Sequence, residues 1–133
     1  MAGAIGAKNA ALIVTSDSEI LVERSMYGND RSWAHCVYGA NTPSPNWYFV
    51  DRVTGWGYQS YVELMNPNGA SVSVDITYYT PTGPYTHSVV MDPHSRETVN
   101  AAVTCPSEQF AIHVTASGNI VAESSMYDGA ATR

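Results

Sequence analysis

The sequence is poor in positive charge and in residues that favour helices. It has six lysine and arginine residues against twelve aspartate and glutamate residues, for a formal net charge of −6. So few cations cannot neutralise a run of phosphates or acidic headgroups, so we expect no nucleic-acid partner and no membrane insertion. Leucine and lysine are scarce, and no long segment has an apolar residue at every third or fourth position. We therefore expect no long helix.

The motifs of common enzymes and metal sites are absent as well. The sequence has no G-x-S-x-G nucleophile elbow, no P-loop and no glycine-rich dinucleotide fingerprint. Carboxylate pairs such as Asp51 and Glu63 occur in any protein with twelve acidic residues and do not by themselves indicate glycoside hydrolysis. The histidines show no ligand spacing and lie on different expected elements: His35, His87, His94 and His113. We expect a protein that is not an enzyme and that uses no metal or other cofactor.

Cysteine is rare, and the start of the chain has no long apolar stretch. Cys36 and Cys105 stand outside any C-x-x-C spacing, so a zinc site is not expected. The two cysteines fit either one disulfide in an oxidising compartment or two buried free thiols, and both alternatives stay open. Residues 1–9 carry neither a signal peptide nor a transmembrane span, so we expect any secretion signal to lie outside this sequence.

The residues that are plentiful favour β-strands: nine tyrosines and abundant threonine, serine and valine. Residues 71–80 alternate strictly, with Val72, Val74, Ile76 and Tyr78 on one side, which predicts a strand with one face in the core. Turn signals recur about every ten residues, and the signal at 66–69 predicts a hairpin between strands at 58–65 and 71–80. We expect an all-β fold, an antiparallel β-sandwich of about seven to nine strands with an immunoglobulin-like architecture.

An internal repeat divides the chain. Residues 11–27 align without gaps to residues 111–127, at an offset of 100, and match at eight of seventeen positions. Each copy has the pattern of two short strands joined by a polar turn, and a period near 100 is the size of an entire β-sandwich domain. The expected organisation is a linker or disordered segment at 1–10, the C-terminal hairpin of a preceding repeat docked on the body at 11–31, a complete repeat at 32–128 and a tail at 129–133.

Short motifs follow one another in a fixed order along the chain. They are Trp47-Tyr48-Phe49, Gly55-Trp56-Gly57 and the segments 61–68, 74–78, 95–100 and 121–127. This succession resembles a tandem repeat domain of unknown function found in long secreted or wall-associated proteins of actinobacteria and related bacteria. The resemblance covers residues 25–127. It implies a secreted or cell-surface location and neighbouring repeats of the same chain as partners, and it implies no catalytic residue. The chain departs from the pattern at Val50-Asp51, where relatives usually have Ala-Glu, and at Ser124, where they usually have Arg.

Glu23 and Glu123 occupy equivalent positions in the two copies of the repeat, within otherwise apolar strands. A buried carboxylate without a partner is costly, so we predict a structural ion pair between at least one of them and Arg96. The alternative is that both glutamates face water.

Trp56 lies between two glycines and is followed closely by Tyr58. Exposed aromatic rings of this kind stack on the apolar faces of sugars, and Asp51 and Gln59 would supply hydrogen bonds to hydroxyl groups, which together would make a ligand-binding site. A tryptophan in such a loop more often caps the open end of a sandwich core. We predict that the Trp56 ring covers core side chains.

The expected function is therefore structural: a spacer or adhesion-type repeat of a secreted or cell-surface protein that presents neighbouring domains. The alternative is a carbohydrate-binding module that anchors the parent protein to a cell-wall or extracellular glycan, and another surface protein is a further candidate partner. An exposed row of two or more of four aromatic residues would favour the glycan alternative: Trp33, Trp47, Trp56 and Tyr58.

Overall fold

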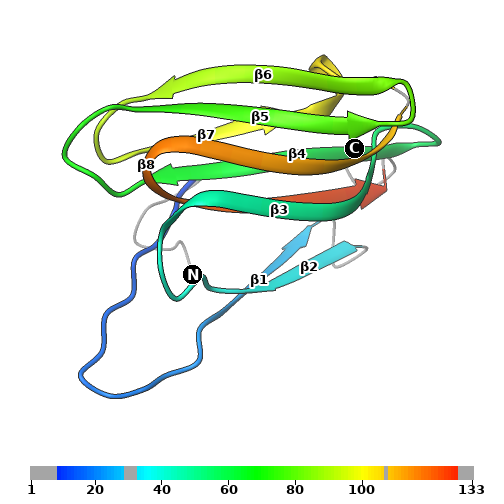
Figure 1. Cartoon of the computed structure of the whole chain (residues 1–133). Coiled ribbons are helices and arrows are strands. Elements are labelled where there is room, and N and C mark those ends of the chain that lie inside the picture. The colour runs from blue at the N-terminus through cyan, green and yellow to red at the C-terminus, as the bar shows by residue number, and fades with distance from the viewer. Residues whose placement is uncertain (1–8, 29–32, 107, 129–133) are drawn as a thin grey trace.

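The computed structural model describes residues 9–28, 33–106 and 108–128, which form eight strands and one short 3-10 turn at Ala101–Val103 (Figure 1). The chain is all-β and sandwich-like, as the turn spacing predicts. The strands are β1 (Glu23–Gly28), β2 (Trp33–Tyr38), β3 (Ser44–Val53), β4 (Tyr58–Asn66), β5 (Val72–Thr80), β6 (Gly83–Met91), β7 (Ser95–Asn100) and β8 (Gln109–Asp128). All of their pairings are antiparallel.

The long strand β8 connects the two layers of the sandwich. Its first half, residues 109–116, lies between β3 and β5, and β6 pairs with the far side of β5. Its second half, residues 121–128, pairs with β4, which pairs in turn with β7. Figure 1 shows β8 turning back at one end of the molecule, so that its two halves belong to facing layers.

Side-chain hydrogen bonds hold the bend of β8. The Asn68 amide Nδ2 donates to the carbonyl of Asn119 at 2.8 Å, and the Trp47 indole donates to the carbonyl of Ile120 at 3.1 Å. The Ser117 hydroxyl accepts the backbone N–H of Ser73 at 3.0 Å. A Cβ at Gly118 would lie 3.2 Å from Val72 Cγ2, so the bend packs closely against β5. These bonds satisfy backbone groups that leave the strand ladder.

The predicted hairpin within residues 111–127 is wrong, because this segment is one bent strand whose halves pair with different partners. The predicted hairpin around residues 66–69 is also wrong, because β4 and β5 do not pair with each other. β5 pairs with the first half of β8 and β4 with the second half, so the loop between β4 and β5 crosses from one layer to the other. Buried Asn66 fixes this crossing by donating to the carbonyls of Ala70 and Asp92, each at 2.9 Å. A turn signal predicts that the chain reverses but does not predict which layer it enters.

The core has the alternation expected of β5. Val72, Val74, Ile76 and Tyr78 are buried together with residues of β4 and β8. Tyr78 meets the ring of Phe110 edge-on, with centroids 5.3 Å apart. The predicted core face of residues 71–80 is therefore confirmed.

The N-terminal region differs from the expectation. Residues 11–22 form no strand. The first repeat copy contributes residues to one strand, β1, which pairs with β2 instead of with residues 11–15. The β1–β2 hairpin lies against the second half of β8 through Arg24 and His35, whereas the segment before it loops away from the sandwich (Figure 1). Among the residues that the structure describes, no helix has the length and apolar character needed to cross a membrane.

Candidate functional site

The turn between β3 and β4 presents Trp56 at one end of the sandwich. The backbone N–H of Tyr58 donates to the carbonyl of Gly55 at 3.0 Å, and the two residues between them have positive φ, 55° at Trp56 and 89° at Gly57. Two positive φ values inside a two-residue turn are the pattern of a type I′ turn, which prefers Asn or Gly at the first position. A bulky aromatic residue is strained there.

Trp56 is 77% exposed and Tyr58 is 42% exposed. The prediction that the Trp56 ring covers the core is therefore wrong: the strained turn directs the indole outward, and core side chains are covered by other residues. Trp47 has the role expected of Trp56, because it packs against the core and its indole donates to the carbonyls of Ser44 and Ile120. The side chain of Trp33 lies outside the part of the chain that the structure describes.

The two polar residues predicted beside Trp56 lie on separate strands. Asp51 sits at a register shift of β3, with φ of 58°, and its side chain is exposed. Gln59 is half-buried on β4 and accepts a hydrogen bond from the Tyr61 hydroxyl at 2.6 Å. Within the described residues, no hydrogen bond joins either residue to Trp56 or Tyr58. The structure thus keeps the exposed aromatic pair and leaves Asp51 and Gln59 as flanking groups.

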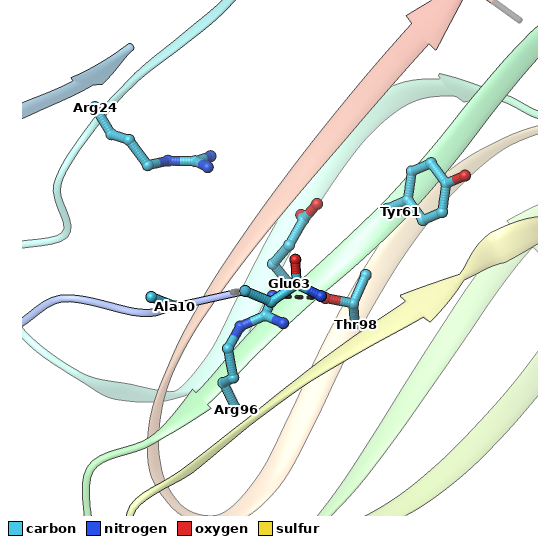
Figure 2. Close-up of a pocket in the computed structure, with 7 residues that line it drawn as sticks. Ala10, Arg24, Tyr61, Glu63, Arg96 and Thr98 are labelled. Carbon is cyan, nitrogen blue, oxygen red and sulfur yellow. Dashed lines mark hydrogen bonds between the residues drawn. The ribbon is translucent and has the colours of Figure 1, made fainter. Parts of the chain in front are cut away.

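A second candidate is a cavity of about 240 Å³ between the N-terminal segment and the outer face of β4 and β7, shown in Figure 2. Glu63 rises from β4, Arg24 enters from β1 and Arg96 from β7 (Figure 2). The remaining lining residues are Asn9, Ala10, Tyr61 and Thr98. Charged groups of both signs therefore meet in this cavity.

The two arginines at this cavity interact with side chains other than Glu63. Glu123 on β8 pairs with Arg24 and lies 3.4 Å from His35 Nε2, and it is the register partner of Glu63 on β4. Arg96 donates to the hydroxyl of Thr98 at 2.6 Å. The structure therefore gives Glu123 a cationic partner, but that partner is Arg24 and not the predicted Arg96. The register that opposes Glu123 to Glu63 leaves Arg96 on the far side of β4, opposite Met65.

Glu23 is exposed on β1 and accepts a hydrogen bond from the Ser25 hydroxyl at 2.8 Å. It belongs to the outward face of the β1–β2 hairpin, as the solvent-facing alternative proposed. The two equivalent glutamates thus have different environments. The β1–β2 hairpin covers Glu123 on β8, whereas Glu23 belongs to that hairpin and lies on its solvent side.

Glu63 is the titratable group whose environment differs most from water in this cavity. Burial raises the pKa of its carboxyl above the usual value, the hydrogen bond from Ser125 opposes the shift, and the nearby Glu123 charge adds to it. The Ser125 hydroxyl donates to Glu63 Oε1 at 2.5 Å, while Oε2 is buried with no hydrogen-bond partner among the described residues. A carboxyl in this setting holds a proton more tightly and can donate a hydrogen bond when protonated.

Both cysteines are free thiols. Cys36 is exposed on β2, and Cys105 is buried in the core, where burial raises the pKa of its thiol. The disulfide alternative is not realised, and the alternative of two buried free thiols holds for Cys105 but not for Cys36, which lies on the exposed β1–β2 hairpin. The described residues contain no cluster of three or more groups able to hold a metal ion.

Two residues of this region were not predicted from the sequence. Arg52 donates to the Ser124 hydroxyl at 2.8 Å and to the carbonyls of Val50 and Asp51, and so fastens the irregular part of β3 to the second half of β8. Arg24 was the other. The available signal for Arg52 was the departure at Ser124 from the Arg that the resemblance implies there. No local pattern marks the second.

Comparison with known proteins places the chain in a family. A family model matches residues 34–124, and its description is a family of unknown function, DUF5719. The chain belongs to DUF5719. No curated protein matches the sequence.

Two solved structures share the fold of this DUF5719 chain. The Thermotoga maritima 1070 crystal structure superposes with a TM-score of 0.61 at 17% identity, over 65% of this chain and 82% of its own. The Anabaena sensory rhodopsin transducer superposes with a TM-score of 0.57 at 13% identity, over 65% of this chain and 100% of its own. Identities this low establish a common fold and nothing about activity.

Proposed function

We propose that this DUF5719 chain is a non-catalytic adhesion module of a secreted or cell-surface protein, and that it anchors the parent protein to a neutral cell-wall or extracellular glycan. The observation that carries the proposal is the exposure of Trp56. This residue is 77% exposed, although its positive φ is unfavourable for a bulky aromatic residue. Backbone strain that no packing interaction of the same residue offsets is typical of functional positions. An outward indole is the residue type that stacks on the apolar face of a sugar ring.

The surroundings of Trp56 fit a neutral sugar better than a charged one. The formal net charge of −6 disfavours anionic polysaccharides at long range. Tyr58 adds a second exposed ring with a hydroxyl, and the exposed Asp51 can accept hydrogen bonds from sugar hydroxyls. Few fixed polar contacts around the ring imply a weak, adhesive interaction rather than tight binding of a small molecule.

Isothermal titration calorimetry with soluble peptidoglycan fragments and neutral oligosaccharides tests this proposal without relying on tryptophan emission. The full chain should give a saturable binding heat, and Trp56→Asn should abolish it while the variant remains folded. Tyr79→Ala removes an aromatic ring that is 53% exposed on β5 and serves as the matched control, with binding unchanged. Equal binding by Trp56→Asn would exclude the site.

A second candidate function is that of a spacer in a tandem array, with neighbouring repeats of the same chain as partners. It is favoured by the repeat of residues 111–127 at 11–27. The two functions are compatible, since an array of adhesive modules multiplies weak contacts through effective concentration.

A further inference from the structure

We propose that residues 11–22 are a donor strand, which completes the sandwich of a neighbouring module of the same fold by occupying the place that residues 111–122 of β8 have in this one. The inference rests on the tandem arrangement proposed above and is independent of glycan binding. It starts from the repeat: residues 11–27 match β8 residues 111–127 at eight of seventeen positions, yet the two copies adopt different structures.

The positions that face the core in β8 are apolar in both copies. Ile112, Val114 and Ile120 are 2%, 0% and 0% exposed in the sandwich. Their counterparts Leu12, Val14 and Ile20 are 72%, 54% and 55% exposed. Ala122 has an apolar counterpart too, Val22. A segment that keeps the core pattern of a strand but exposes it to water carries the cost of unburied apolar surface.

The bend is repeated as well. In β8 the change of layer occurs at Ser117-Gly118-Asn119, and the chain bends at Asp17 and Ser18, the equivalent positions of the first copy. Polar residues therefore interrupt both apolar patterns at the same place. Residues 11–22 therefore correspond to the first half of β8, its bend and the first two positions of its second half, and the remaining positions of the second half correspond to β1.

The partner follows from what β8 contacts. Its first half takes main-chain hydrogen bonds from β3 and β5, and its second half from β4. In this chain β8 itself fills that place, so residues 11–22 need another set of β3, β4 and β5 strands. A second module of the same fold supplies both the hydrogen-bonding edges and the apolar face, which is the chemistry of strand addition.

A fused chain tests the donation directly. Residues 33–110 are placed immediately before residue 11 of the full chain, so that residues 11–27 follow the new copy in the position that 111–127 normally have. The amides of residues 12–22 should then exchange at least about 100-fold more slowly than in the single chain, because they join a cooperative sandwich. Exchange at the same rate in both chains would overturn the proposal.

Two matched substitutions report on the face that is buried. Val14→Asp places a charge at the position equivalent to buried Val114, and Thr15→Asp places it on the opposite face, one residue further. Val14→Asp should remove the protection of 12–22 in the fused chain and leave the unfolding of the single chain unchanged. Thr15→Asp should preserve the protection. Equal effects of the two substitutions in the fused chain would contradict a strand with one face in a core.

A replacement within the single chain keeps the test decisive if the fused copy does not fold. Residues 111–122 are exchanged for 11–22 with Gly118 retained, because a Cβ there would press on Val72. The exchanged chain should unfold cooperatively, whereas the same exchange shifted by one residue should not fold. If the in-register exchange fails like the shifted one, residues 11–22 are not a β8-type strand. A fused chain with two folded copies and unprotected 12–22 would leave the tandem arrangement standing without strand donation.

Discussion

Replacing Trp56 by Asn should leave the stability of the protein almost unchanged, although tryptophan is the largest residue in the chain. Asn adopts positive φ more readily than Trp, so the substitution lowers the free-energy cost of the left-handed conformation by roughly 1–2 kcal/mol. Trp56 is 77% exposed, so about a quarter of its surface is covered. An aromatic side chain has roughly 150–250 Å² of surface to bury, so the covered part is on the order of 50 Å², and its loss costs about 1 kcal/mol. The two effects nearly cancel, and the expected change is within about 1 kcal/mol of zero.

Urea denaturation followed by circular dichroism measures this change without depending on tryptophan emission. Trp47→Ala is the control: it removes a ring that packs against the core and donates two hydrogen bonds, so it should cost about 3–5 kcal/mol. A loss of more than about 2 kcal/mol for Trp56→Asn would mean that the indole covers core side chains after all.

The remaining predictions concern buried polar groups and one ion pair. Tyr78→Phe should stabilise the protein by about 1 kcal/mol in chemical denaturation, because the Tyr78 hydroxyl is buried without a partner among the described residues; a loss would reveal a bond that the phenol makes. Burial raises the pKa of Glu63, so its favourable contribution is present below the usual carboxyl pKa and is lost as the pH rises through the folded value. Glu63→Gln should therefore raise the denaturation midpoint at about pH 7 and have little effect at about pH 4, and the opposite trend would contradict the shift. Arg24→Ala should cost about 1 kcal/mol and Arg96→Ala less, since only Arg24 pairs with a carboxylate within the described ranges; the reverse order in matched denaturation curves would restore the pairing with Arg96.

The sequence carries the local part of this fold. The alternation of Val72, Val74, Ile76 and Tyr78 predicts the core face of β5 because the period of a strand is a local property. The course of β8 could not be predicted in the same way. An apolar run, a polar interruption and a second apolar run describe a hairpin and a bent strand equally well, and the choice is made by β3, β4 and β5, which are distant in the sequence.

The candidate site, too, could be predicted from the sequence only in its local features. Residue types at 55–59 identified the aromatic pair, but the direction of the Trp56 ring depends on the turn type, and turn propensities argue against Trp at that position. The partner of Glu123 depends on a hairpin formed by residues about a hundred positions earlier, so Arg96 and Arg24 were indistinguishable from composition. Exposure and register, which are long-range properties, decided both cases.

Cosedimentation with insoluble cell-wall polysaccharide and purified peptidoglycan tests the adhesion proposal most directly. The full chain, Trp56→Asn and Tyr79→Ala are each mixed with a series of neutral and anionic glycans, and the bound fraction is measured against glycan concentration. We predict saturable binding of the full chain and of Tyr79→Ala to at least one neutral glycan, with Trp56→Asn left in the supernatant. Failure of the full chain to bind any of the glycans, or equal binding by Trp56→Asn, would contradict the proposal.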